Sequence, residues 1–246
     1  MNTILHHKNL LSTIEIIVLN KISVIIPALN EEKSISKVIS SIPKYVNEII
    51  VVDNGSADKT SEIAKSKGAL VLFESKKGYG YACIKAIEFL KSNPPNILVF
   101  LDGDYSDYPE EMNLLINPII KNKYEFVMGA RIKKLREPGS MTLQQVFGNF
   151  LACFLIRILY RVNFKDLGPF RAIKWDSLQK LKMEDKTFGW TIEMQLKAIK
   201  NKIKYFEVPV KYRNRIGKSK ISGTFSGTIK AGYKILLWIF KYYFKR

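Results

Sequence analysis

Histidine and cysteine are the scarcest chemically active residues of this sequence. Its 246 residues include two histidines, His6 and His7, and two cysteines, Cys83 and Cys153. Because no histidine follows position 7, the body of the chain has no Ser–His–Asp or Cys–His arrangement, which excludes the usual nucleophilic triads. Two cysteines are too few for a metal cluster, and we interpret them as small apolar residues of a protein in a reducing compartment.

Acidic residues are missing from the C-terminal part of the chain. No Asp or Glu follows Glu207, whereas ten Lys or Arg residues do, and the net charge of the whole chain is +18. A generally basic proteome would explain part of this excess, but the excess also favours polyanionic partners. No nucleic-acid-binding module is recognisable, so we expect no nucleic-acid partner and instead an anionic membrane surface or a phosphorylated substrate.

Long apolar runs, repeats and low-complexity linkers are also absent from the sequence. No stretch reaches the ~20 apolar residues of a membrane-spanning helix. Residues 1–20 lack the ordered charged, apolar and cleavage regions of a signal peptide, and we interpret them as an N-terminal extension. The prediction is therefore one domain over 21–222, followed by a separate basic segment over 223–246.

What the chain does contain is a regular alternation of strand-like and helix-like segments. Apolar, β-rich runs lie at 22–27, 48–53, 69–74, 97–102 and 126–128, and helical patterns separate them. Strands that alternate with helices indicate βαβ units, so we predict an α/β fold with a mainly parallel sheet flanked by helices. The second half adds a broadly apolar helix at 145–161, a helix at 190–201 and a strand at 203–208.

The C-terminal segment is predicted to be an amphipathic helix over about 224–244. Four lysines fall in one narrow arc at helical spacing, and most other positions are aliphatic or aromatic: Lys230, Lys234, Lys241 and Lys245. This pattern favours a helix that lies in the plane of a membrane surface. The alternatives are a helix packed on the domain itself, or one packed on a second subunit of a homo-oligomer.

Two carboxylates one residue apart, Asp102 and Asp104, follow the apolar run 97–101. Ligands of open α/β sheets bind beyond the carboxyl ends of the strands, which is where this pair lies. Mg²⁺ is commonly held by one or two carboxylates together with substrate phosphates. The pair therefore predicts a divalent-cation site in an enzyme that handles a nucleotide diphosphate; the alternative is a solvated acidic turn.

Several further residues are candidates for binding a nucleotide or phosphates. Asp53 ends a second strand and is predicted to contact the base or ribose. The alternative is that Asp53 only stabilises a turn or caps the next helix, since Asp-Asn-Gly is a common turn sequence. Gly78 and Gly80 lie just before a helix, where backbone N–H groups can meet a phosphate; the alternative is a plain loop. The basic candidates for phosphate binding are Arg131, Arg171, Arg213, Arg215, Lys218 and Lys220, the last four of them in one glycine-containing loop.

One competing enzyme class is excluded by the turn after the first strand. That turn reads Pro-Ala-Leu-Asn-Glu-Glu at 27–32 and has none of the glycines of a G-x-G-x-x-G dinucleotide-binding turn. A dinucleotide-dependent oxidoreductase is therefore not expected, even though the alternation of strands and helices would suit one.

Taken together, these segments resemble the family 2 glycosyltransferases of GT-A fold, and within them the dolichyl- and polyprenyl-phosphate sugar synthases. The resemblance spans residues 22–220 and rests on 24–32, 49–58, 102–104, 129–131, 166–172, Glu193 and 215–220. It implies a Rossmann-like nucleotide-diphospho-sugar transferase fold. It also implies that Asp102 and Asp104 hold Mg²⁺ or Mn²⁺.

The same resemblance places the remaining site residues. The nucleotide-sugar site is expected at Pro27, Ala28, Asn30, Glu31, Asp53, Gly80, Asp102 and Gly103. The phosphates of acceptor and donor are expected at Arg131, Arg171, Arg213, Arg215, Lys218 and Lys220. Asp104 and Glu193 are the carboxylates expected to orient the acceptor.

The expected reaction is transfer of a hexose, with inversion, from a nucleotide diphosphate sugar to a polyprenyl phosphate. The donor stays open between the UDP-glucose and GDP-mannose types, because Ser106 and Asp107 depart from the mannose-type pattern, which has Gln two residues after the second aspartate. We expect the protein to lie peripherally on the inner face of the cytoplasmic membrane. The alternative is a polysaccharide, protein or other non-lipid acceptor, which would need Glu193 as a general base.

Overall fold

The structure is a computed structural model that describes residues 20–217 and 225–244. The predicted N-terminal extension, apart from Asn20, lies outside the described residues. So do Lys218 and Lys220 of the predicted basic loop.

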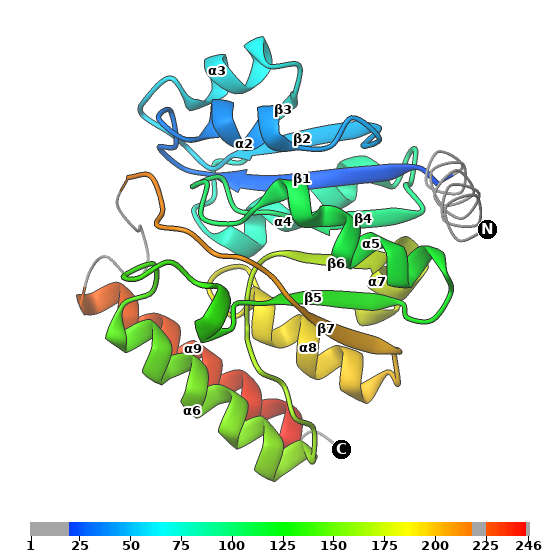
Figure 1. The fold of residues 1–246 in the computed structure, drawn as a ribbon, viewed down its shortest axis with the longest axis vertical. Coiled ribbons are helices and arrows are strands. Elements are labelled where there is room, and N and C mark those ends of the chain that lie inside the picture. The colour runs from blue at the N-terminus through cyan, green and yellow to red at the C-terminus, as the bar shows by residue number, and fades with distance from the viewer. Residues whose placement is uncertain (1–19, 218–224, 245–246) are drawn as a thin grey trace, which may run out of the picture.

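A mainly parallel sheet forms the centre of the described part of the chain (Figure 1). Its seven strands run in the order β3-β2-β1-β4-β6-β5-β7. Pairing is parallel except for β6, which is antiparallel to both β4 and β5. The strands are β1 (Ile22–Ala28), β2 (Glu48–Asp53), β3 (Leu70–Phe73), β4 (Ile97–Phe100), β5 (Phe126–Ala130), β6 (Arg171–Lys174) and β7 (Tyr205–Pro209). The prediction of an α/β fold with a mainly parallel sheet is confirmed.

Helices cover both faces of this sheet. The α-helices are α2 (Ile35–Ser41), α3 (Thr60–Ser66), α4 (Tyr79–Leu90), α5 (Met112–Ile120), α6 (Leu143–Tyr160), α7 (Trp175–Leu181), α8 (Trp190–Lys200) and α9 (Phe225–Phe244). Two short 3-10 helices, η1 (Pro109–Glu111) and η2 (Lys133–Leu135), complete the helical elements. The sheet thus separates two apolar cores, one with α2, α3 and α5 and the other with α4, α8 and parts of α6 and α9.

Strand β6 and helix α7 were not predicted from the sequence. Strand β6 has four residues, begins and ends with a basic residue, and runs directly into α7, so no apolar period marks it. It becomes a strand because it lies between β4 and β5, where Ala172 and Ile173 are fully buried. This insertion joins the second half of the chain to the sheet.

Helices α6 and α9 pack side by side at one end of the molecule (Figure 1). The Tyr160 hydroxyl donates to the Ile239 carbonyl at 2.6 Å, and the rings of Tyr160 and Tyr243 meet edge to face. Helix α6 begins at a capping box, in which the Thr142 hydroxyl accepts from the Gln145 N–H. By length and composition α6 could cross a membrane, contrary to the expectation that no segment qualifies.

Each of these two helices keeps an apolar face exposed. The large exposed apolar side chains are Leu143, Val146, Phe147, Phe150, Phe154 and Ile158 on α6, and Ile229, Tyr233, Leu237, Phe240, Tyr243 and Phe244 on α9. Exposed apolar area of this extent is unusual on a monomeric soluble domain and marks an interaction surface. We call these twelve residues the apolar platform.

Candidate active site

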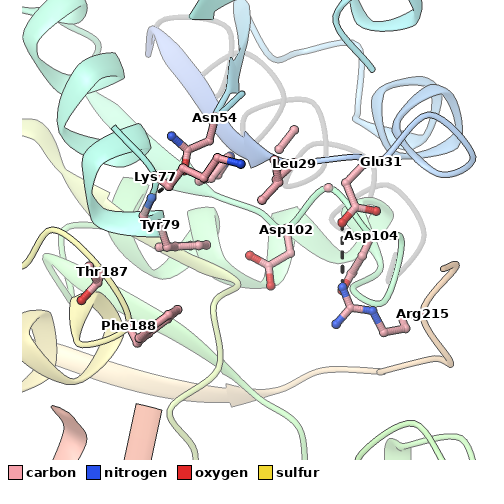
Figure 2. Close-up of a pocket in the computed structure, with 14 residues that line it drawn as sticks. Leu29, Glu31, Asn54, Lys77, Tyr79, Asp102, Asp104, Thr187, Phe188 and Arg215 are labelled. Atoms are coloured by element: carbon pink, nitrogen blue, oxygen red, sulfur yellow. Dashed lines mark hydrogen bonds and ion pairs between the residues drawn. The ribbon is translucent and has the colours of Figure 1, made fainter. Parts of the chain in front are cut away.

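A cleft opens where β1 and β4 reach their carboxyl ends (Figure 2). The parallel register of these strands places Ala28 and the residues after Phe100 at the same edge of the sheet. The cleft has a volume of about 290 Å³. It is lined by Pro27, Ala28, Leu29, Glu31, Asn54, Lys77, Gly78, Tyr79, Asp102, Gly103, Asp104, Thr187, Phe188 and Arg215.

The two aspartates of the predicted cation site both line this cleft, but in different surroundings. Asp104 Oδ1 accepts from the Ser106 N–H at 2.9 Å and from the Ser106 hydroxyl at 2.5 Å. Its Oδ2 pairs with the Arg215 guanidinium at 2.9 Å. Asp102 Oδ1, in contrast, is buried without a hydrogen-bond partner. One carboxylate is therefore held in place, and the other has an unsatisfied oxygen.

This unsatisfied oxygen fits a divalent cation. Burial, followed by repulsion from Asp104, raises the pKa of Asp102 to about 7. A cation next to both carboxylates would offset that repulsion and satisfy the free oxygen. Within the described residues no cluster of three or more His, Cys, Asp or Glu side chains could hold a metal. Among the described carboxylates, Asp102 and Asp104 would thus hold the cation, together with substrate phosphates or water.

Arg215 brings positive charge to the same edge of the cleft. Besides Asp104, its guanidinium lies 3.9 Å from the Glu31 carboxylate. The segment that carries it is tied to the acidic turn by backbone hydrogen bonds from Arg213 N to Ser106 O and from Ile216 N to Asp104 O, both 2.9 Å. Arg215 therefore lines the cleft beside the two aspartates. That it binds a donor phosphate there stays a prediction.

Two other predicted phosphate-binding arginines, Arg171 and Arg213, do not line the cleft. Arg171 is fully buried in β6, and its guanidinium donates to the carbonyls of Leu167, Gly168 and Thr191. Arg213 is stacked between Tyr105 and Tyr108, with its guanidinium carbon 3.6 and 3.8 Å from the two ring centroids. Burial and three carbonyl acceptors commit the Arg171 guanidinium to the protein, so the prediction that Arg171 receives a phosphate was wrong. The phosphate-binding role of Arg213 stays a prediction, because stacking leaves the N–H edge of its guanidinium able to donate.

Arg131 lies outside the cleft, beside α6. It forms a two-pronged ion pair with Asp166, at 2.7 Å from Nε and 2.8 Å from Nη2. It also lines a second hollow of about 390 Å³ between the 131–136 segment and α6. The basic and aromatic residues of that hollow are Arg131, Lys133, Arg136, Phe150, Phe154, Arg157, Phe164 and Lys165. The phosphate-binding role of Arg131 stays a prediction.

Glu193 cannot orient an acceptor from its place in the fold. Its side chain is fully buried at the start of α8 and does not line the cleft. Its two oxygens accept from the Glu184 and Asp185 N–H groups at 2.8 Å each, and Lys197 lies 2.7 Å away. The predicted catalytic role is wrong: Glu193 holds the loop before α8, and helical spacing alone could not reveal that its face points into the core.

Three predicted nucleotide-site residues lie near the cleft without lining it. Asp53 accepts from the Ser56 N–H at 2.8 Å and from the Ser61 hydroxyl, which is the turn chemistry considered as the alternative. The Asn30 side chain accepts from the Ala57 N–H at 2.7 Å. Gly80 is buried in the first turn of α4. Contact of these residues with a base, ribose or phosphate stays a prediction.

The structure adds cleft residues that the sequence did not indicate: Leu29, Asn54, Lys77, Tyr79, Thr187 and Phe188. Gly78, which the sequence singled out together with Gly80, also lines the cleft. The pair Lys76-Lys77 before Gly78 was a usable signal, since basic residues at a glycine turn before a helix suit phosphate binding. Thr187 and Phe188 had no such signal, because they come from a loop about 85 residues beyond the aspartates and reach the cleft only through the tertiary fold.

Comparison with known proteins gives consistent matches. The profile described as glycosyl transferase family 2 matches residues 23–186. A UDP-N-acetylglucosamine–dolichyl-phosphate N-acetylglucosaminyltransferase of Methanococcus voltae is 32% identical over 213 residues, covering 77% of this chain and 84% of that protein. An uncharacterized glycosyltransferase of Mycobacterium tuberculosis is 30% identical over 213 residues, covering 85% and 94% of the two chains.

Among solved structures, glucosyl-3-phosphoglycerate synthase of Mycobacterium tuberculosis in complex with Mn²⁺, UDP and glucosyl-3-phosphoglycerate is similar in fold. The TM-score is 0.72 at 22% identity, with 91% of this chain and 80% of that chain covered. The complex of the same enzyme with Mn²⁺, UDP-glucose and phosphoglyceric acid gives a TM-score of 0.74 at 21% identity, with 91% and 80% covered.

Proposed function

The chain belongs to glycosyl transferase family 2, and from that premise we propose that it transfers a hexose from a UDP-linked sugar to a polyprenyl phosphate at a membrane surface. Family membership makes the protein a glycosyltransferase of GT-A fold. The observation that carries the finer proposal is the apolar platform on α6 and α9, which continues into the basic and aromatic hollow around Arg131. An acceptor with a phosphate head and an apolar tail matches that combination of charge and apolar area.

The residues of the cleft suit the chemistry of this transfer. An oxygen of the acceptor phosphate attacks the anomeric carbon, the bond from that carbon to the donor diphosphate breaks, and the nucleoside diphosphate leaves. A divalent cation, Mg²⁺ or Mn²⁺, held by Asp102 and Asp104 would neutralise charge on the departing diphosphate. Arg215 and Lys77 line the same cleft and would add positive charge to the leaving group.

The burial of Glu193 supports a phosphate acceptor. An alcohol acceptor needs a carboxylate base beside its hydroxyl, whereas a phosphate is already ionised near neutral pH. Glu193, the candidate for that base, is enclosed in the core and bonded to backbone N–H groups. A transferase that relies on positioning and charge therefore agrees better with this site than one that relies on Glu193.

The same surface supports the proposal of a membrane location. The platform is apolar, and the C-terminal part from Val208 onward has ten basic and no acidic residues. Apolar side chains beside basic ones favour binding to the anionic inner face of a cytoplasmic membrane. We therefore propose that the enzyme is peripheral on that face, with α6 and α9 both in contact with lipid.

The proposal is tested by assaying purified full-length protein with radiolabelled UDP-glucose, UDP-N-acetylglucosamine or GDP-mannose, Mn²⁺ and undecaprenyl phosphate. We expect label from a UDP-sugar to enter the organic phase only when undecaprenyl phosphate is present. A parallel reaction with phosphoglyceric acid addresses the small phosphorylated acceptor of the solved synthases. The proposal of a lipid acceptor is contradicted if label enters phosphoglyceric acid alone, or if folded protein transfers no label to the lipid.

A further inference from the structure

The loop over residues 184–189 lies between helix α9 and the cleft. Thr187 and Phe188 from this loop line the cleft on the side away from Arg215 (Figure 2). Two residues earlier, Asp185 Oδ2 accepts from the indole N–H of Trp238 on α9 at 2.6 Å. Both side chains are buried, Asp185 at 2% exposure and Trp238 at 3%. A buried hydrogen bond to a charged acceptor thus joins α9 to the wall of the cleft.

The Asp185 carboxylate also sets the shape of the loop. Its Oδ1 accepts from the backbone N–H groups of Thr187 at 2.7 Å and Gly189 at 3.0 Å. Lys234, one turn before Trp238 on α9, lies 3.2 Å from Oδ2. The same side chain therefore holds the loop backbone with one oxygen and α9 with the other, so a shift of α9 would be passed directly to Thr187 and Phe188.

The loop has no room to move independently of its neighbours. A Cβ atom on Gly189 would overlap the indole nitrogen of Trp238, and one on Gly80 would overlap the Asp185 carbonyl. On the cleft side, the Lys186 carbonyl accepts from Tyr81 N at 3.0 Å, at the start of α4. The loop is thus enclosed between α9 and the N-terminus of α4.

We propose that Trp238 is a positioning residue for donor binding: through Asp185 it fixes the loop that forms one wall of the nucleotide-sugar cleft. The proposal rests on the cleft being the donor site of the proposed function. Through this contact, the affinity for the donor depends on how α9 packs against the loop. Thermodynamic linkage then requires that a bound donor also strengthens the packing of α9. The opposite face of α9 belongs to the apolar platform, which places the lipid surface and the donor site at the two sides of one helix.

The test compares two matched variants, Trp238→Phe and Tyr160→Phe. Each keeps an aromatic ring and removes one hydrogen bond that tethers α9, which is buried for Trp238 and part-buried for Tyr160. Tyr160 donates to the Ile239 carbonyl at 2.6 Å without reaching the loop. Binding of UDP-glucose with Mn²⁺ is measured by calorimetry. We expect Trp238→Phe to weaken binding at least about fivefold and Tyr160→Phe to change it less than about twofold.

Thermal unfolding of the two variants separates positioning from general stability. Both should melt below the wild type, because both lose a hydrogen bond that ties α9 to the rest of the protein. Equal donor affinity of Trp238→Phe and the wild type, or equal weakening by both variants, overturns the proposal. Should Trp238→Phe not fold, the pair Lys234→Met and Lys230→Met repeats the comparison, because both lysines are on α9 and only Lys234 pairs with Asp185.

Hydrogen exchange of the unmodified protein gives an independent readout. Amides of residues 229–244 should exchange more slowly when UDP-glucose and Mn²⁺ are bound, although these residues do not line the cleft. Unchanged exchange with the donor bound overturns the proposal. A wild-type protein that binds none of the nucleotide sugars instead contradicts the proposed function, so the two failures can be told apart.

Discussion

At the scale of single residues, the two aspartates of the cleft differ in how the fold satisfies them. Asp104 is held by Ser106 and Arg215, while Asp102 keeps a buried oxygen without a partner. An unpaired oxygen beside a second carboxylate is costly unless a cation binds or a proton is taken up. The pair is therefore better explained by cation binding than by a solvated acidic turn.

This difference leads to a prediction for the cation. Asp102→Asn and Asp104→Asn should each lower kcat/KM for sugar transfer by about 100-fold or more, and a chelator should abolish transfer by the wild type. Asp176→Asn, an exposed acid at the start of α7, is the matched control and should keep wild-type activity. Full activity of both cleft variants would exclude a cation site at this pair.

Glu193 is expected to act on stability and positioning rather than on the chemical step. Glu193→Gln replaces a buried carboxylate paired with Lys197, so it should lower the free energy of unfolding by about 2 to 4 kcal/mol and raise the KM for the donor. The kcat at saturating donor should stay within about twofold of the wild type. Steady-state kinetics decide the matter, since a kcat loss of about 100-fold at unchanged KM would restore the base role.

Glu207 on β7 predicts a pH dependence of stability. Burial raises its pKa to about 7 from an ordinary 4.5, so between these values the folded protein holds a proton that the unfolded chain has lost. The stabilisation is complete below the unfolded pKa and is lost as the pH rises through 7. Glu207→Gln cannot titrate, so the fall in melting temperature from pH 5 to pH 8 should be smaller in this variant. An identical fall in melting temperature in both proteins would show that Glu207 does not cause this pH dependence.

At the scale of secondary-structure elements, α6 and α9 combine two roles. Their inner faces pack on the domain through Cys153, Ile156, Trp238 and Ile239, and their outer faces form the apolar platform. The sequence favoured α9 as a membrane-surface helix, with packing on the domain or on a second subunit as alternatives. Helix α6 carries equally prominent side chains, such as Phe147 at 66% and Phe150 at 64% exposure. The platform is therefore a two-helix surface rather than a single tail.

This arrangement predicts that α6 contributes directly to lipid binding. Phe147→Asp together with Phe150→Asp should weaken partition to anionic vesicles by about tenfold or more, since each exposed ring inserts apolar area into lipid. Phe89→Asp, at an exposed position on α4 outside the platform, is the control and should not change partition. Co-sedimentation with phosphatidylglycerol vesicles measures the effect, and equal partition of the three proteins would remove α6 from the membrane surface.

At the scale of the whole molecule, charge and apolar area act together. The net charge of +18 favours attraction to an anionic surface, and the range of this attraction decreases as the salt concentration rises. The apolar platform contributes to binding only where its side chains touch the surface. The platform and the cleft are joined through α9 and the 184–189 loop. The surface that we propose to face lipid and the cleft that we propose to bind the donor therefore lie on adjoining elements.

The two forces can be separated by salt. Raising the ionic strength should weaken binding to phosphatidylglycerol vesicles, because screening removes most of the attraction at about 1 M salt. Binding to neutral phosphatidylcholine vesicles should change little, since only the apolar contact contributes there. A salt-independent affinity for anionic vesicles would mean that the basic residues do not face the lipid.

The sequence by itself determined the α/β fold, most strand positions and the acidic pair, because these depend on local apolar periodicity and on residues adjacent in the chain. Only the tertiary structure decided which distant residues meet: it buried Glu193 and Arg171, stacked Arg213 between two tyrosines, and brought Thr187 and Phe188 to the cleft. It also formed β6 from a segment with no strand signal, by placing it between two buried strands. The physical reason is that burial and pairing are set by contacts across the whole chain, whereas a sequence pattern reports only its own neighbourhood.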